Sequence, residues 1–304
     1  MKIQLLDVLI NSQNPDGGWG YSSGKRSALE PSAYAFLALR SSASQSNAFM
    51  RALQFLRDRQ LECGGWPVNT VSLEPEAWVT ALVGMALHSV EGFSQACKRS
   101  AEYVLRSFAR MQIDWITRLR DWIGLQHQLN VDPHLGGWGW TTQTAKWLEP
   151  TCMALIFLNR VKTKMNSPHL DDVLSESEQM TYSRMCRGGG WNYGNVQVLG
   201  EQLRPFALTT ALALIALQHH ASSPANQQSL DYLLASVTHE KSALTLCFSC
   251  LCLDLYSRRW EELQAQTRNL FTETNFFGDL KIVALALLVL EAGEGQNPFR
   301  YASA

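Results

Sequence analysis

The sequence lacks any hydrophobic run long enough to cross a membrane. Its longest wholly apolar stretch, Ile282–Leu290, has nine residues, whereas a membrane-spanning helix needs about 20. An excess of one charge is also missing, because 26 Lys and Arg face 27 Asp and Glu, and this balance argues against a general nucleic-acid binder. No signal peptide is recognisable after Met1, and the seven cysteines form an odd number. We therefore expect reduced thiols and a cytoplasmic location.

Several motifs of common chemistries are missing as well. The chain has no Gly-rich phosphate loop, no Ser nucleophile elbow and no zinc-protease helix. Cys247, Cys250 and Cys252 are spaced like metal ligands, but they lie in an apolar run and are better explained as buried thiols. These missing motifs lead us to expect no metal and no cofactor. Strand-like alternation of apolar and polar residues is also absent, so we predict an all-α protein.

Tryptophan, by contrast, is abundant, and its spacing reveals a repeat. Four of the ten tryptophans follow a pair of glycines, and the steps between them are 47, 72 and 53 residues. They are Trp19, Trp66, Trp138 and Trp191. Repeats on this scale are typical of solenoids and toroids, in which each unit is one supersecondary motif.

Each repeat contains two kinds of helix. The loops after the tryptophans end in Leu-Glu-Pro or Leu-Arg-Pro, and because Pro favours the first helical position we expect a helix to start there. These second helices are rich in Ala and Leu and nearly uncharged beyond the first turn, which indicates burial. We predict them at Pro31–Arg40, Pro75–Val90, Pro150–Val161 and Pro205–His220.

The preceding helices are amphipathic, as in Ala48–Gln60, and are expected to lie outside. Two weaker hairpins follow, 226–256 and 260–291, which brings the number of outer–inner pairs to six. We therefore predict a single domain over 1–304, an α6/α6 toroid around an apolar central cavity. An extra helical insertion is expected within 93–130, where Trp115, Trp122 and several basic residues would either pack on the barrel or contact a membrane surface.

The Gln-Trp pattern carries a family resemblance. Phe55-Leu56-Arg57-Asp58-Arg59-Gln60, followed by Gly64-Gly65-Trp66, resembles the repeat of triterpene cyclases, and Gln13 to Trp19 is a second copy. A longer pattern consists of Gly-Gly-Trp, a loop, an acidic residue at a helix start and an Ala/Leu-rich helix. It resembles the repeats of squalene–hopene cyclases and protein prenyltransferase β-subunits, which belong to the terpenoid cyclase and prenyltransferase superfamily. The resemblance implies that Gln13 and Gln60 bond main-chain groups and that the four repeat tryptophans stack on helix ends as structural elements.

The sequence also departs from that family. The Asp-x-Asp-Asp acid motif of class II terpene cyclases is absent, and the adjacent pair Asp171-Asp172 lies at an expected outer-helix start. No inner helix offers the Asp, Cys and His set with which protein prenyltransferases hold zinc. The chain has one toroid, whereas triterpene cyclases add a second barrel.

Acidic residues at the helix starts are the candidate catalysts. Glu30, Glu74 and Glu149 stand in matching Leu-Glu-Pro sequences at the loop ends, which we call corners. A closed ring of helices is expected to bring these corners to one end of the central cavity. Glu76 lies beside Glu74, and Arg204 stands in the fourth corner, Leu-Arg-Pro. Clustering and burial raise the pKa of a carboxyl group, which yields a proton donor near neutral pH. The alternative is that each acid only stabilises a helix dipole.

Aromatic residues near the same helix starts are candidates for the binding pocket. They are Tyr34, Trp78, Trp140, Trp147, Tyr21, Tyr193 and Phe206. Aromatic faces stabilise carbocations, although aromatics at helical spacing are also ordinary core residues. The leading hypothesis is metal-independent, acid-initiated cyclisation or isomerisation of an isoprenoid, with Glu74 or Glu76 as the acid. The alternatives are a non-catalytic toroid that binds a lipid or protein, and a carbohydrate-active (α/α)6 enzyme.

Overall fold

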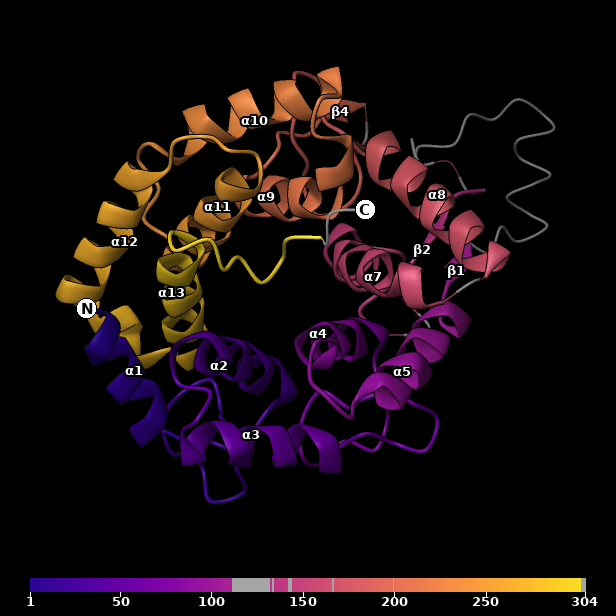
Figure 1. Ribbon diagram of the computed structural model, residues 1–304. Coiled ribbons are helices and arrows are strands. Elements are labelled where there is room, and N and C mark those ends of the chain that lie inside the picture. Colours follow the sequence, from indigo (N-terminus) through magenta and orange to yellow (C-terminus); the bar gives the residue numbers. More distant parts are fainter. Residues whose placement is uncertain (111–131, 133, 142–143, 166, 199, 302–304) are drawn as a thin grey trace.

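Six helical hairpins form a closed ring in the computed structural model, which confirms the predicted toroid (Figure 1). The structure describes the whole chain except residues 111–131, 133, 142–143, 166, 199 and 302–304. The outer helices are α1 (Lys2–Asn11), α3 (Asn47–Asp58), α5 (Ser94–Arg106), α8 (Pro168–Ser183), α10 (Pro224–Val237) and α12 (Glu261–Thr274). The inner helices are α2 (Leu29–Ser42), α4 (Ala77–Leu87), α7 (Leu148–Val161), α9 (Ala207–Ala216), α11 (Ala243–Leu255) and α13 (Leu280–Ala292).

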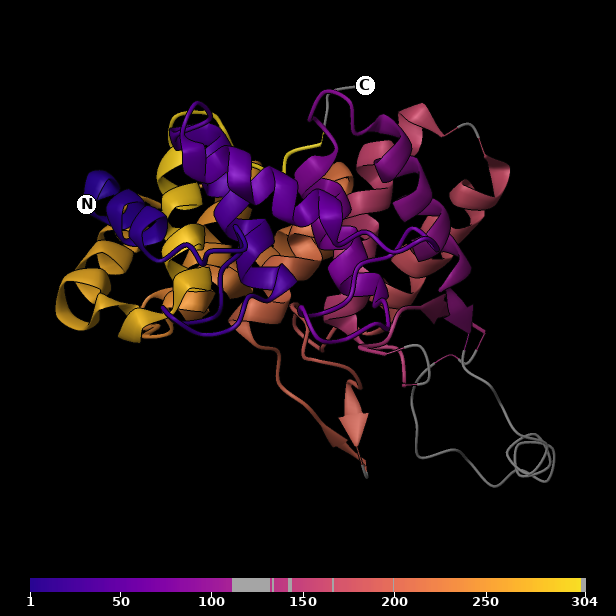
Figure 2. The same cartoon turned by 90° about the horizontal axis from the view of Figure 1, so that it is seen from below.

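The other regular elements among the described residues are short. Two antiparallel two-stranded pairs lie in loops, β1 (Ala109–Arg110) with β2 (Gly136–Gly137), and β3 (Gln197–Val198) with β4 (Glu201–Gln202). Three single 3-10 turns, η1 (Lys162–Lys164), η2 (Gln218–His220) and η3 (Asn275–Gly278), follow α7, α9 and α12. The β3–β4 hairpin projects from the end of the ring where the inner helices begin (Figure 2).

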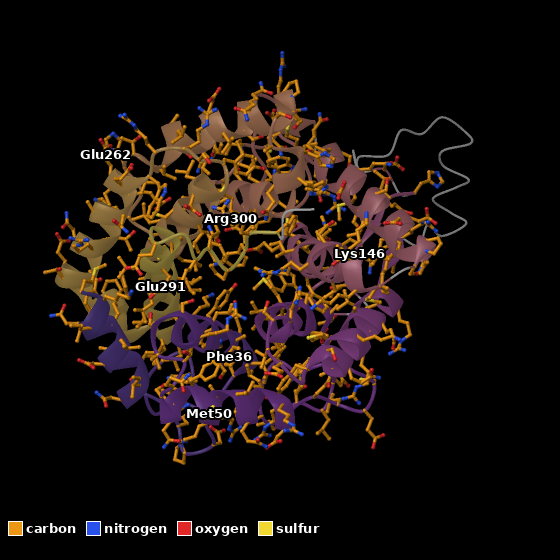
Figure 3. The ribbon with its side chains drawn as sticks, in the orientation of Figure 1. Phe36, Met50, Lys146, Glu262, Glu291 and Arg300 are labelled. Atoms are coloured by element: carbon orange, nitrogen blue, oxygen red, sulfur yellow. The ribbon has the colours of Figure 1, made fainter. Side chains whose placement is uncertain are left out.

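The inner helices are packed on nearly all sides, as their composition predicts. Each contacts its two inner neighbours, and α13 packs against α2 to close the ring. The outer helices bury only the face that packs on the inner helices. In α3, Phe49 stacks on Phe36 of α2 with ring centroids 4.9 Å apart, whereas Met50 on the outer face is 55% exposed (Figure 3). The predicted burial of Cys247, Cys250 and Cys252 within α11 is confirmed.

The four repeat tryptophans are structural, as the resemblance implies. Each is buried, and each donates its indole N–H to a backbone carbonyl of the preceding outer helix at 2.7–2.8 Å. Gln60 donates from Nε2 to the carbonyls of Gly64 and Ala96, at 3.0 Å each, and Gln13 makes the matching pair of bonds. Each repeat tryptophan, together with glutamine in the first two repeats, therefore ties the end of one outer helix to the following turn.

A glycine is required at this turn. Gly64 has a φ of +93°, and a Cβ built on it would lie 2.4 Å from the carbonyl oxygen of Arg99 in the next outer helix. Gly17 has a similar φ and the same close approach, to Arg51. The Gly-Gly sequence thus permits both the left-handed backbone and the contact with the neighbouring repeat.

The predicted insertion within 93–130 falls only partly on the described residues. Ser94–Arg106 is α5, the ordinary outer helix of the third hairpin, so the extra residues begin after it. Ala109 pairs with Gly137 and Arg110 with Gly136, and this short ladder joins the two ends of the extra segment. The apolar stripe around Trp115 and Trp122 lies outside the described residues. Among the helices that the structure describes, none has the length and apolarity needed to span a membrane.

The residues after α13 cross the ring at the end where the inner helices finish (Figure 1). Phe299 is fully buried there, Asn297 donates to the carbonyl of Leu251, and the hydroxyl of Tyr301 donates to the carbonyl of Ala216. This tail covers the C-terminal ends of the inner helices. Access to the axis is therefore from the opposite end, which we call the mouth.

Candidate functional site

The register of the inner helices decides which side chains reach the axis. The residue before each of the first four inner helices donates its backbone N–H to the carbonyl of the repeat tryptophan, at 2.9–3.0 Å. Four residues further on, a Ser or Thr hydroxyl accepts the tryptophan backbone N–H. The aligned cap residues are Ala28, Glu76, Trp147 and Phe206.

This alignment corrects the matching of the four corners. Pro31 and Pro150 lie inside the first turns of α2 and α7, whereas Pro75 and Pro205 precede the cap residues of α4 and α9. The helix starts predicted at the four prolines are therefore wrong. Proline fits both places because the first helical N–H groups need no intrahelical acceptor. Glu74 and Arg204 consequently do not match Glu30 and Glu149.

The second residue of every inner helix points to the axis and lines a small recess. This ring consists of Glu30, Trp78, Glu149, Leu208, Leu244 and Lys281. One turn deeper, apolar side chains form the floor, namely Tyr34, Leu82, Met153, Leu212 and Phe248. The recess has a volume of about 60 Å³, and Trp140 from a mouth loop lies at its edge. It is thus an apolar depression with three ionisable groups at its rim.

Glu30 is held by two partners at this rim. The Tyr21 hydroxyl donates to its Oε2 at 2.5 Å, and Lys281 Nζ lies 3.4 Å from its Oε1. Lys281 also lies over the Tyr21 ring, 5.9 Å from the centroid. The Glu30 and Lys281 side chains are only 18% and 17% exposed, so this ion pair is shielded more than a surface pair.

Glu149 differs from Glu30 in its environment. Burial raises the pKa of its carboxyl group from the ordinary value of 4.5 to about 7, Lys281 opposes this rise, and the charge of Glu30 adds to it. A large share of Glu149 is therefore protonated at neutral pH. The recess therefore combines a carboxyl group that titrates near neutral pH with a carboxylate–ammonium pair.

Glu149 should make folding pH-dependent. Its pKa is higher in the folded state than in the unfolded one, so stability falls as pH rises from about 4.5 to about 7. We expect Glu149→Gln to remove this loss and to gain about 2–3 kcal/mol over the wild type between pH 4 and pH 8. Urea unfolding across that range measures the difference. Identical pH profiles for the two proteins would show that Glu149 is not buried as described.

The other predicted acids lie away from the recess. Glu74 is exposed in the loop before α4. Glu76 is the residue before α4 and lies beside a separate depression with Trp138 and Lys146, where burial and the charge of Glu74 raise its pKa to about 6. Arg204 is exposed and lies over the Phe206 ring, 5.8 Å from its centroid. Of the predicted set Glu30, Glu74, Glu149 and Arg204, only Glu30 and Glu149 line the recess, so the full convergence is wrong. The expectation that one glutamate of the set faces the recess with a raised pKa agrees with Glu149.

The predicted aromatic residues do surround the mouth. Tyr34 is buried in the floor, and Trp78 meets Trp140 edge to face with ring centroids 5.3 Å apart. Tyr193 packs against Phe206, and its carbonyl accepts a hydrogen bond from the backbone of Leu148, next to Glu149. Five of them are 37–44% exposed, namely Tyr21, Trp140, Trp147, Tyr193 and Phe206. They form a rim of aromatic surface around the recess.

Sequence reasoning missed Lys281, Met153 and Phe248. Asp279 is the residue from which the position of Lys281 could have been predicted. Its carboxylate accepts hydrogen bonds from the backbone N–H groups of Lys281 and Ile282 and so caps α13. Counting two residues from that cap places Lys281 in the ring.

No family model and no curated protein matches this chain. Among solved structures, an α-1,6-mannanase from Salegentibacter sp. superposes with a TM-score of 0.61 at 11% identity, covering 97% of this chain and 98% of its own. An α-amylase from Clostridium perfringens gives 0.61 at 9%, covering 96% and 98%. A type II terpene cyclase from Scytonema gives 0.60 at 13%, covering 97% and 96%. At these identities the likeness establishes the toroid fold alone.

Proposed function

We propose that this toroid binds an apolar, isoprenoid-like molecule at the mouth and that Glu149 donates a proton to it. The observation that carries the proposal is the position of Glu149, a largely buried carboxyl group whose pKa burial raises to about 7 and that adjoins aromatic side chains. A general acid works best when its pKa is near the working pH. Aromatic faces next to it are suited to stabilising positive charge in the substrate.

The size of the recess restricts how such a ligand lies. A water molecule needs roughly 10–15 Å³ of this kind of volume, so about 60 Å³ accepts the end of a chain and not a whole polyprene. The remainder of the ligand would lie on the exposed aromatic rim. Glu30 and Lys281 then face the reacting end, where the carboxylate stabilises a developing cation. The predicted assignment of Glu74 or Glu76 as the acid is replaced by Glu149.

A carbohydrate-active enzyme is the second candidate, favoured by the two carboxyl groups at one aromatic-rimmed mouth. In the mannanase, an inactive variant replaces two adjacent aspartates. The adjacent pair of this chain, Asp171 and Asp172, is exposed on the outer helix α8, where Asp171 pairs with Lys162 at 2.8 Å. Glycoside hydrolysis here would therefore have to use Glu149 as acid and Glu30 as base or nucleophile.

Binding separates these candidates. Native mass spectrometry of the purified protein, alone and after incubation with squalene, oxidosqualene, mannotriose or maltotriose, is expected to show an apolar adduct. Trp78→Ala should weaken this adduct, because Trp78 lines the recess, whereas Trp260→Ala in the outer wall should not. Preferential binding of an oligosaccharide would replace the first candidate by the second. Binding of a lipid without any product under all conditions would indicate a non-catalytic toroid.

A further inference from the structure

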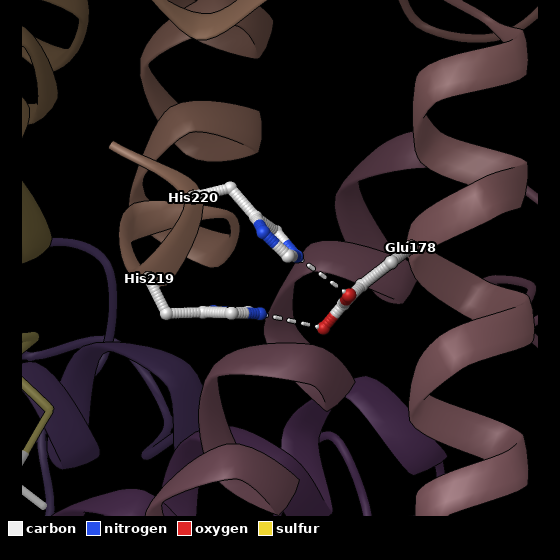
Figure 4. Close-up of side chains that lie close together, drawn as sticks. All are labelled: Glu178, His219 and His220. Carbon is white, nitrogen blue, oxygen red and sulfur yellow. Dashed lines mark hydrogen bonds and ion pairs between the residues drawn. The ribbon is translucent and has the colours of Figure 1, made fainter. Parts of the chain in front are cut away.

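A cluster of three metal-ligand side chains lies far from the mouth, between α8 and the turn that follows α9 (Figure 4). Nε2 of His219 lies 3.0 Å from Oε1 of Glu178, and Nε2 of His220 lies 3.0 Å from Oε2 of the same carboxylate. All three ligand atoms are within 4.8 Å of one another. Because α9 begins at the mouth and ends before His219, a length of roughly 15 Å separates this cluster from the axial recess.

We propose that Glu178, His219 and His220 bind a zinc ion with one coordination position left open. Two imidazoles and one carboxylate are a ligand set that zinc uses in proteins, with bonds of about 2.0–2.2 Å. Tetrahedral coordination at these lengths separates the ligand atoms by roughly 3.3 Å. The N···O distances in the cluster are 3.0 Å and all three ligand atoms lie within 4.8 Å, so small side-chain rotations would bring them to this separation.

The surroundings hold the imidazole rings in place. His219 lies beside Tyr301, with ring centroids 6.0 Å apart, and the Tyr301 hydroxyl is fixed on the carbonyl of Ala216. His220 lies beside Tyr182 at 6.1 Å, and the Tyr182 hydroxyl donates to Asn226. Side chains fixed by such neighbours lose little freedom when a metal binds.

The electrostatics also favour a cation. The two histidines lie in η2, which begins two residues after the end of α9, and the C-terminal end of a helix carries partial negative charge. Both imidazole Nε2 atoms converge on the oxygens of a single carboxylate. A divalent ion accounts for this convergence, because it takes the place of both N–H protons. Glu178 is 16% exposed and the histidines are 36% and 42% exposed, which leaves the open position accessible to water.

Zinc titration of chelator-treated full-length protein, followed by calorimetry, tests the site. We expect one equivalent of zinc to bind, and a rise in melting temperature of about 5 °C at a zinc concentration 100-fold above Kd. Glu178→Gln and His220→Ala should each raise Kd roughly 100-fold or more, because each loses a ligand. His169→Ala is the matched control, since His169 is an exposed histidine on the same helix α8, and it should bind zinc as the wild type does.

Cobalt provides a measurement that does not depend on the variants folding. Cobalt-loaded wild-type protein is expected to show the visible bands of a tetrahedral ion without thiolate-to-cobalt charge transfer. Charge-transfer absorption would instead place the metal on a cysteine and overturn the proposal. The absence of stoichiometric zinc binding by the wild type, or unchanged affinity in folded Glu178→Gln, would overturn it as well. Neither result depends on whether the mouth binds an isoprenoid.

Discussion

Replacing Glu149 by glutamine is expected to lower turnover of the apolar substrate by a factor of about 10²–10⁴. Glutamine has nearly the same shape but cannot donate a proton as an acid does, so the recess and its affinity for the ligand should persist. Product formation, followed by gas chromatography and mass spectrometry, gives turnover, and native mass spectrometry gives binding. A loss confined to turnover is the signature of a proton donor.

Glu76→Gln is the matched control for this experiment. Glu76 also has a raised pKa, but it lies beside Trp138 and Lys146 in a different depression. The same substitution there should leave turnover unchanged. If Glu76→Gln abolished turnover and Glu149→Gln did not, the acid would lie outside the axial recess and the proposed mechanism would be wrong.

Replacing Trp66 by alanine is expected to lower the free energy of unfolding by about 3–5 kcal/mol. The indole is fully buried, and its N–H donates to the carbonyl of Leu56 at 2.7 Å. Truncation leaves a cavity and removes that bond at the end of α3. Urea unfolding monitored by circular dichroism measures the loss.

Trp147→Ala serves as the comparison, because this tryptophan is 38% exposed and lies on the mouth rim. We expect it to cost about 1 kcal/mol or less, since a partly exposed ring loses less buried surface. Equal losses in the two variants would mean that the Gly-Gly-Trp turns do not hold the ring together.

The fold could be predicted because its determinants are local and repeated. Glycine pairs, buried tryptophans and Ala/Leu-rich helices recur in register, and each has its own physical requirement at its own position. Six hairpins, four of them with a Gly-Gly-Trp turn, leave few ways to bury their apolar faces other than a closed ring. The fold therefore did not depend on any single correct helix boundary.

Predicting the site, in contrast, required correct helix boundaries. The four Leu-Glu-Pro or Leu-Arg-Pro sequences look alike, yet they stand differently relative to their helices. Glu30 and Glu149 are the second residues of α2 and α7, whereas Glu74 and Arg204 lie two residues before the cap residues of α4 and α9, in the preceding loops. A better signal was available: Ser32, Thr80 and Thr151 follow their tryptophans by 13 or 14 residues, and these hydroxyls fix the register.

The fourth repeat obscured this signal. Thr210 follows Trp191 by 19 residues, because the β3–β4 hairpin lengthens the loop between them. Glu149 was identified from its Leu-Glu-Pro sequence, but the charge of Lys281 that acts on it was not, since the two residues come from different repeats. The balance of burial and charge that separates Glu149 from Glu30 depends on distances across the ring, and no local pattern encodes them.

The contact between α2 and α13 has a consequence for how the protein is made. Glu30 and Lys281, which meet across it, are 251 positions apart in the chain. Ribosomes add about 5–20 residues per second, so roughly 12–50 seconds pass between the synthesis of these two residues. During that interval the face of α2 that α13 later covers has no partner, and prematurely released chains should attract chaperones and proteases. The mouth, whose rim needs both residues, is among the last parts of the molecule to be completed.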